Sequence, residues 1–399
     1  MIRLFKKLIY INKSTTQILA MRHLPPPPWI PAGKSSLILY IILLFFQCSA
    51  PAVSKPILSQ GEGQPLSALT EAELCSRKKS EDSWAEVITA CDKAIQRNPK
   101  LAQLWVHRCH AQLSLGRLVD AKTDCQEALR LDPFNALGLV RSGNIQQRLR
   151  YYDAALSDYN KAIRLDPSSV PAFGNRGLLR LATKDYRGAI ADFNKVIQLD
   201  PNDLNAYVSR AYANEQLDNF SGALADYTVA ITLDPKKVTH RYNRALMYIL
   251  LKDYSAALAD LDHVIAGSPQ WYAPYNERGY VKAVLKDYRS AIADYDQAIA
   301  LSEYKEVGIP LSNRARAKQW SGDSPGALLD AQLAIEHDPI QASLHVEYGE
   351  ILFLQGRREE ACASFRRGSS IGPIERFIKY DLPALDTEYL HNCYPKSKP

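Results

Sequence analysis

Prolines recur along this chain at a fixed interval, and that interval constrains the fold more than any other feature. Six of them, from Pro99 to Pro269, follow one another with a 34-residue period, and Pro339 and Pro373 are separated by the same interval. The gap between the two series is two such intervals plus two extra residues. Self-similarity at a fixed period predicts a stack of one repeated structural element. We number nine repeats, which start at Ala68, Ala102, Ala136, Val170, Leu204, Val238, Tyr272, Gly308 and Ala342.

Within a repeat, the apolar residues are spaced as they are on helices. Counted from the first residue of each repeat, apolar or small side chains fill positions 4, 8 and 12, as in Phe173, Gly177 and Leu181, and again positions 20, 24 and 27. Spacings of three, four and seven residues place each set on one helical face. Asp-Pro at positions 31 and 32 ends the second helix, because a residue before proline avoids the α region. Each repeat is therefore predicted to be a helix pair that buries its apolar face by stacking on its neighbours.

One segment of the sequence resembles the repeat motif of a known protein family. Residues 189–201 read Ala-Ile-Ala-Asp-Phe-Asn-Lys-Val-Ile-Gln-Leu-Asp-Pro, and with the 34-residue period they resemble the second helix and stop of a tetratricopeptide repeat. The resemblance covers residues 68–375 and implies an all-α fold, a right-handed α-solenoid of about nine helix–turn–helix repeats. Residues 1–50 are then a basic and apolar leader, 51–67 a linker, and 376–399 a C-terminal capping helix and tail. Repeat 7 departs from the pattern, because Glu303 replaces the proline, so we expect a longer helix or loop over Ser302–Val307.

A charged pair recurs with the repeat. Position 7 is Arg in six repeats, and in each of these position 23 is Asp. The pairs are Arg108 with Asp124, Arg176 with Asp192, Arg210 with Asp226, Arg244 with Asp260, Arg278 with Asp294, and Arg314 with Asp330. A guanidinium can grip a carboxylate with two hydrogen bonds, so we interpret each pair as a bridge between the two helices of one repeat. An anion-binding row of arginines fits less well, because each Arg comes with a neutralising Asp.

The resemblance also implies where a partner binds. In this family the first helices line a concave groove, and positions 2, 5, 6, 9, 12 and 13 tend to face the ligand. Amide side chains there offer a donor and an acceptor to a peptide backbone, and tyrosines offer flat area with a polar tip. The predicted partner-binding residues are Asn175, Asn243, Asn313, Tyr212, Tyr280, Tyr242 and Asn276. An Asn at position 6 is also common in such repeats without any ligand.

The two-carboxylate clamp of chaperone-binding family members is not expected in this chain. That clamp needs Lys at position 5 and Asn at position 9, whereas position 5 of repeats 2–9 holds no basic residue. Asn144 does occupy position 9 of repeat 3, but Val140 is at position 5 of that repeat. We therefore predict a protein partner, bound as an extended peptide or a helix, that is not a chaperone tail held by this clamp.

Cysteines occupy core positions of the first two repeats. Cys75 and Cys109 are at position 8, and Cys91 and Cys125 are at position 24. Small buried thiols are the ordinary expectation for such positions. If the leader takes the chain to an oxidising space, one or two disulfides between helices are expected instead, and the spacing does not decide their pairing.

Nothing in the sequence indicates an active site, a cofactor or a metal. His107 and His110 have a legal spacing for two ligands on one helix, but no third ligand is fixed beside them. The chain has no phosphate-binding glycine loop, nucleophile elbow or zinc-protease motif. We therefore predict a non-enzymatic scaffold or adaptor. The alternative is a structural component that self-associates, or docks in a membrane or envelope complex, through its ends.

The basic charge belongs to the leader. The segment 1–61 holds seven Lys or Arg and no Asp or Glu, which leaves the rest of the chain at −1 out of a total of +6. A near-neutral body has no electrostatic footprint for nucleic acid, so no nucleic-acid partner is predicted.

The leader also predicts export or membrane association. Residues 37–46 form an unbroken apolar run, and Ala50-Pro51-Ala52 follows as a cleavage-like motif. Even extended over residues 37–53, the segment is short for a bilayer span. A cleaved signal, an uncleaved anchor, lipidation at Cys48 and an organelle transit peptide stay open as alternatives, with a true start at Met1 or Met21. The chain is thus expected to be exported or membrane-anchored, which means periplasmic or secreted in a bacterium, or else targeted to an organelle.

Overall fold

The computed structural model describes residues 71–76, 84–303, 306–372 and 393, and these residues form helices with no strand among them. The chain divides into two compact parts, Met1–Leu233 and Asp234–Pro399, and each is described by itself. The predicted leader, linker and capping helix lie outside the described residues, apart from Cys393. None of the helices in the described ranges combines the length and the apolar character that crossing a bilayer requires.

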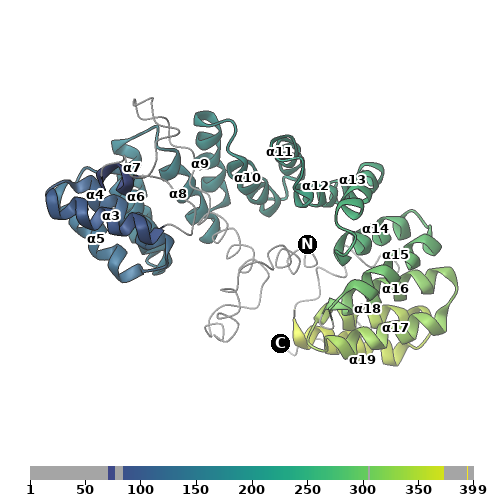
Figure 1. Cartoon of the computed structure of the whole chain (residues 1–399). Coiled ribbons are helices and arrows are strands. Elements are labelled where there is room, and N and C mark those ends of the chain that lie inside the picture. The colour runs from purple at the N-terminus through teal and green to yellow at the C-terminus, as the bar shows by residue number, and fades with distance from the viewer. Residues whose placement is uncertain (1–70, 77–83, 304–305, 373–392, 394–399) are drawn as a thin grey trace. The chain divides into compact units, whose positions relative to one another are not determined.

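In the N-terminal part the helices form consecutive pairs, which correspond to repeats 1–5 (Figure 1). The bounds are α2 Glu71–Ser76 and α3 Trp84–Arg97; α4 Ala102–Ser114 and α5 Leu118–Leu131; α6 Ala136–Arg148 and α7 Tyr152–Leu165; α8 Val170–Ala182 and α9 Tyr186–Leu199; α10 Leu204–Gln216 and α11 Phe220–Leu233.

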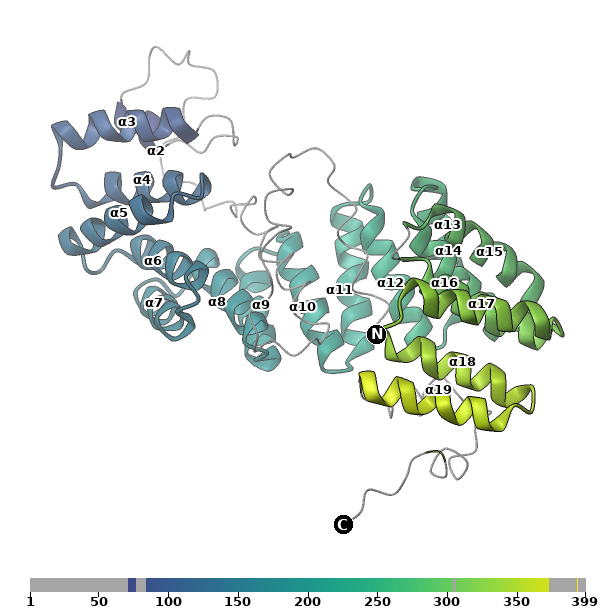
Figure 2. The same cartoon turned by 90° about the horizontal axis from the view of Figure 1, so that it is seen from below.

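The C-terminal part continues the same pattern with repeats 6–9, and Figure 2 shows α16 beside α17 and α18 beside α19. The bounds are α12 Val238–Leu250 and α13 Tyr254–Gly267; α14 Tyr272–Val284 and α15 Tyr288–Leu301; α16 Gly308–Ser321 and α17 Ser324–His337; α18 Ala342–Leu354 and α19 Arg358–Ile371.

The helix starts agree with the repeat pattern in the sequence. The first helix of repeats 2–9 begins at the predicted residue in every case, from Ala102 of α4 to Ala342 of α18. The predicted α-solenoid of nine helix pairs is therefore confirmed over the described residues. In repeat 7, α15 is as long as α13, and α16 does not begin until Gly308. The two extra residues thus lengthen the connection between helices and not the second helix.

The packing order identifies the inner side of each part. Every second helix packs against the first helix of its own repeat, and within each part each first helix also contacts the first helix of the next repeat, as α4, α6 and α8 do in turn. No pair of second helices in the described residues makes a comparable contact within either part. A stack whose first helices are closer together bends toward them. Each part therefore presents its first helices on the inner side, as the family resemblance implies.

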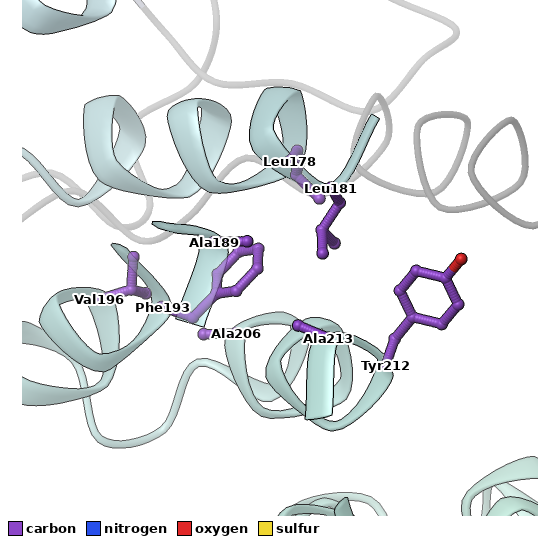
Figure 3. Close-up of a cluster of buried hydrophobic side chains, with 8 residues drawn as sticks. All are labelled: Leu178, Leu181, Ala189, Phe193, Val196, Ala206, Tyr212 and Ala213. Atoms are coloured by element: carbon purple, nitrogen blue, oxygen red, sulfur yellow. The ribbon is translucent and has the colours of Figure 1, made fainter. Parts of the chain in front are cut away.

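The core of a typical repeat is a small residue at position 8 facing an aromatic ring at position 24. Figure 3 shows the ring of Phe193 from α9 within a buried cluster that includes Leu181 and Ala189. Gly177 of α8 lies against that ring, so close that a Cβ at this position would be 2.9 Å from it. The same pairing joins Gly143 to Tyr159, and it recurs in repeats 7 and 9. The close approach of the two helices therefore depends on the missing side chain at position 8.

We expect opposite effects from adding the same methyl group at two glycines of α8. Gly177→Ala should lower the free energy of unfolding by about 1–3 kcal/mol, because the buried Phe193 ring has no room to move away. Gly174→Ala should raise it by about 0.5–1 kcal/mol, because a Cβ there would meet its nearest neighbour, Val196, only at 4.0 Å and alanine favours a helix. Urea denaturation of both variants checks the difference. Equal effects would show that position 8 is not a close-packed contact.

Candidate functional site

The six Arg–Asp pairs predicted from the sequence all form, and they are buried. In repeat 5, Arg210 donates from Nη2 to Asp226 Oδ1 at 2.6 Å and from Nε to Oδ2 at 3.0 Å. Asp226 is 4% exposed, and the Asp of every other pair is similarly buried. The bridges hold the two helices of a repeat together, so a solvated surface ladder does not describe them.

Five of the six bridges extend to the preceding repeat, which the sequence analysis did not predict. The third guanidinium nitrogen of Arg108 donates to Asp92 at 2.6 Å, and that of Arg176 donates to Asn160 at the same distance. The acceptors are at position 25 of the repeat before, and further examples are Asn194 with Arg210, Asp262 with Arg278, and Asp296 with Arg314. The pKa of Arg108 is raised, first by its hydrogen bond to Asp124 and further by Asp92. These arginines are fully engaged in structure and are not available to a ligand.

Six cysteines are paired in disulfides. Cys75 is joined to Cys91 across repeat 1, with a Cα–Cα distance of 4.7 Å, and Cys109 to Cys125 across repeat 2, with 5.6 Å. Of the alternatives that the sequence left open, free buried thiols or disulfides, the structure has the disulfides. A third bond joins Cys362 of α19 to Cys393, which lies beyond the repeats. The repeat pattern gives no signal for that pair.

Four of the seven predicted partner-binding residues are buried. Tyr212 is 5% exposed and lies at the edge of the cluster in Figure 3, with its oxygen directed away from Phe193. The Tyr242 ring packs on Trp271, with 4.5 Å between ring centroids. Asn313 and Asn276 are joined by a hydrogen bond of 2.8 Å. The expectation that these side chains offer open contact area is therefore corrected, because in this structure they make internal contacts.

The other three predicted residues remain partly exposed on first helices. They are Asn175 of α8 in the N-terminal part, and Asn243 of α12 and Tyr280 of α14 in the C-terminal part. Partner binding at all seven positions stays a prediction, and these three are the ones with accessible side chains.

The inner faces of the two parts differ in charge. Helices α4, α6 and α8 contain no Asp or Glu, whereas they carry five arginines, of which Arg141 and Arg148 make no hydrogen bond to an Asp among the described residues. In the C-terminal part, positions 6 and 9 of α14, α16 and α18 hold three glutamates and one arginine. They are Glu277, Arg316, Glu347 and Glu350. Arg316 Nε lies 3.2 Å from Glu350. The first helices of repeats 2–4 therefore carry only basic charge, whereas Glu277, Glu347 and Glu350 of repeats 7–9 are buried.

The two histidines of α4 have other contacts. His107 shares a hydrogen bond of 3.1 Å with Gln103, and burial, together with the charge of Arg141, lowers the pKa of His107 to about 4. The ring of His110 meets Trp84 edge to face at 5.1 Å. Within the described residues there is no group of three or more side chains arranged to hold a metal ion.

Glu215, at position 12 of α10, makes the stability of the N-terminal part depend on pH. Burial raises the pKa of Glu215 from 4.5 to about 7, although the Tyr227 hydroxyl donates a hydrogen bond to it. A raised carboxyl pKa means that the folded state binds the proton more tightly, so stability is lost as the pH rises from about 4.5 through about 7. Glu215→Gln should therefore raise the free energy of unfolding at pH 8 by up to about 3 kcal/mol, and change it little at pH 4. The melting temperature should rise at pH 8 accordingly. Thermal melts at both values, with the exposed Glu336→Gln as control, check this. An equal effect at both pH values would contradict it.

Comparison with known proteins gives a family and a set of fold neighbours. The tetratricopeptide repeat family model matches residues 140–204 and 205–270. No curated protein matches the sequence. Among solved structures, the chain is similar to the Cut9–Hcn1 hetero-tetramer of APC/C, with 16% identity over 82% of this chain and 62% of that one, and a TM-score of 0.47. It is similar to a tetratricopeptide repeat protein from Parabacteroides merdae ATCC 43184, with 20% identity over 73% and 98%, and a TM-score of 0.43.

YrrB, whose structure is described as a TPR protein with an unusual peptide-binding site, has 22% identity over 46% of this chain and 95% of its own, with a TM-score of 0.41. The chain spans less than two thirds of the length of the Cut9–Hcn1 chain. The matched residues 140–270 lie within a 34-residue pattern that continues on both sides of them, and helix pairs follow that pattern through the described residues. Residues 140–270 of the chain are tetratricopeptide repeats.

Proposed function

We propose that this protein is a non-enzymatic adaptor that holds a segment of another protein against its first helices. The observation that carries the proposal is that some side chains of each repeat are used in packing while others remain partly exposed. The apolar positions and the Arg–Asp bridges pack within and between repeats, whereas positions 6, 9 and 13 of α4 and α6, together with Asn175 of α8 and Asn243 of α12, keep polar side chains partly exposed. Hydrogen-bonding groups on a preformed stack suit capture of an extended peptide or a helix.

The chemistry of position 5 favours a partner other than a chaperone tail held by the two-carboxylate clamp. Position 5 of the eight first helices from α4 to α18 holds no Lys or Arg. In the N-terminal part that position is Val106, Val140, Gly174 and Val208, which cannot donate a charged hydrogen bond from a side chain. Cationic groups on the inner face of that part come instead from α6.

We also propose that the protein works in an oxidising compartment, reached through the apolar segment at residues 37–53, either exported or anchored at a membrane. Three disulfides support this, because such bonds persist outside the reducing cytosol. The alternative is targeting to an organelle. The disulfides are compatible with that alternative only for an organelle with an oxidising interior.

Crosslinked affinity capture from the native source tests the adaptor function. The full-length chain is compared with Asn175→Ala/Asn243→Ala, which removes the two partly exposed amides at position 6, and with the exposed loop residue Asn202→Ala as matched control. We expect one or a few proteins to be recovered with the wild type and the control, and less of the same proteins with the double variant. Equal recovery by all three would remove the amide row from the binding surface, and recovery of only the chain itself would favour self-association.

A further inference from the structure

The face of α6 carries a set of hydrogen-bond donors that make no hydrogen bond to a carboxylate among the described residues. Arg141, Asn144 and Arg148 are three, four and seven residues apart, so they share one side of the helix. They occupy positions 6, 9 and 13, which face the inner side of the N-terminal part. We call these three residues the α6 donor stripe.

Arg141 is a cation without a counter-ion in the described structure. Its Nε is buried and has no hydrogen-bond partner, and neither Arg141 nor Arg148 has a salt bridge among the described residues. The adjoining first helices α4 and α8 supply no carboxylate, because neither contains Asp or Glu. Burial lowers the pKa of Arg141 to about 10, which leaves it charged at neutral pH. A guanidinium whose Nε is buried without a partner costs stability in the free protein.

The neighbouring side chains leave this cation open to a ligand and do not neutralise it. The Tyr159 hydroxyl donates to Asn144 Oδ1 at 2.7 Å, so the oxygen of that amide is turned toward the ring. The Asn144 amide nitrogen is then the end of the side chain that can donate to a ligand. Arg148 donates from Nη1 to the Leu113 carbonyl at the end of α4, at 2.7 Å, which fixes its guanidinium beside the stripe.

The arginines of α4 and α8 differ from Arg141 and Arg148 of α6, because each of them is paired with a carboxylate. Arg108, Arg176 and Arg180 are bonded to the carboxylates of Asp124 or Asp192 from the second helices. In repeat 3 the corresponding second-helix residue, Asp158, accepts instead from Ser142. Within the described part of the chain, the fold thus neutralises the structural arginines and gives Arg141 and Arg148 no carboxylate.

We propose that the α6 donor stripe binds a carboxylate of the partner segment, from an Asp or Glu side chain or from a chain end. This inference rests on the proposed adaptor function and names the chemistry of its partner. A planar guanidinium pairs a carboxylate with two hydrogen bonds, and a buried cation gains most from it. Asn144 and the partly exposed Asn175 on α8 supply amide donors for the peptide backbone beside it. An RNA strand fits less well, because two cations on a near-neutral body cannot follow a phosphate backbone.

Fluorescence anisotropy with the oxidised full-length chain tests the proposal. The probes are labelled Ser-Gly peptides at low salt: one with internal Glu and an amidated end, one with internal Gln and a free carboxylate, one with Gln and an amidated end, and a short single-stranded RNA. We expect at least one carboxylate peptide to bind more tightly than the neutral one, and the better of the two identifies the source of the carboxylate. Arg141→Gln and Arg148→Gln should each weaken that binding by about tenfold or more.

Arg164→Gln is the matched control, because Arg164 is an exposed arginine on the second helix of the same repeat. It should leave the affinity unchanged. No preference for carboxylate peptides, an equal loss with Arg164→Gln, or tighter binding of the RNA would each overturn the proposal.

A second measurement needs no ligand. Arg141→Gln should raise the melting temperature of the free protein by about 2–4 °C, because it removes an unpaired buried charge. A lower melting temperature would mean that Arg141 already has a counter-charge, and would overturn the proposal. If Arg141→Gln recovers the same proteins from the native source as the wild type while the Asn175/Asn243 variant does not, the adaptor function stands and this inference fails.

Discussion

Replacing Asp226 by alanine is expected to lower the free energy of unfolding by about 3 kcal/mol or more. The substitution takes away the acceptor of two hydrogen bonds from Arg210 and of a longer one, 3.4 Å, from Asn214. The Arg210 guanidinium would then keep only its link to Asn194 of the preceding repeat. Removing one partner of a buried pair is costly because the remaining charge has lost both water and its counter-ion. Urea denaturation of the full-length chain measures the effect.

The control is a salt bridge on the surface of the same part of the chain. Glu127 accepts from Arg130 at 2.6 Å with good geometry, but this pair is on the outside of α5, where solvent screens it. Glu127→Ala should therefore have only a small fraction of the Asp226 effect. If the two substitutions cost the same, the Arg–Asp bridges contribute no more than surface pairs do, and the buried-bridge interpretation is wrong.

Reduction of the Cys75–Cys91 and Cys109–Cys125 disulfides is expected to destabilise repeats 1 and 2 locally, by about 3 kcal/mol for each bond. In five of the other repeats an aromatic residue occupies position 24, as Phe193 does opposite Gly177. Repeats 1 and 2 have a cysteine at both positions, so after reduction two small side chains would be left where a ring packs elsewhere. Stacked repeats contact only their neighbours, so the loss should stay local. Hydrogen exchange under native conditions should show residues 84–131 losing protection in reductant while residues 170–217 keep theirs.

Thiol counting provides the control for that experiment. The chain has seven cysteines, of which six are paired in the structure, so the unfolded, unreduced protein should show one free thiol, Cys48, or none if the leader has been removed. Six or seven free thiols in protein from its native compartment would contradict the disulfides there. Loss of protection spread evenly over all repeats would contradict the local role.

The fold could be predicted from the sequence because one local pattern recurs nine times along the chain. A helix start at Val170 or Leu204 follows from the Asp-Pro stop before it and the apolar spacing after it, and both helices begin there. The Arg–Asp pairs were accessible for the same reason, since a covarying pair within the sequence of one chain marks a contact. The bond that five of these arginines make to the repeat before them left a similar signal that was not used: position 25 is Asp or Asn before those five repeats. Where the next position 7 is Ser142 or Tyr348, position 25 is Gln.

The candidate site was harder to predict from the sequence. The exposure of a side chain depends on neighbouring residues, which its position within the repeat does not specify. Tyr212 and Tyr280 share position 9, yet Tyr212 is buried in a cluster with Leu181 while Tyr280 is partly exposed. Asn313 shares position 6 with Asn175, but it is buried because Asn276 of the previous repeat bonds to it. The isolation of Arg141 is likewise visible only when the carboxylates around it have been placed. The third disulfide was missed because Cys393 belongs to no repeat.

The central claim is that stacking uses up the buried faces of the helix pairs, and that the protein acts through the first-helix side of each part. Site-specific photocrosslinking in the native source tests this most directly, with a photoreactive amino acid at Asn175 on first helix α8, and in a second variant at Lys161, exposed on second helix α7. We expect crosslinks to a partner protein from position 175 and few or none from position 161. Crosslinks to the same partner from position 161 alone would contradict the claim.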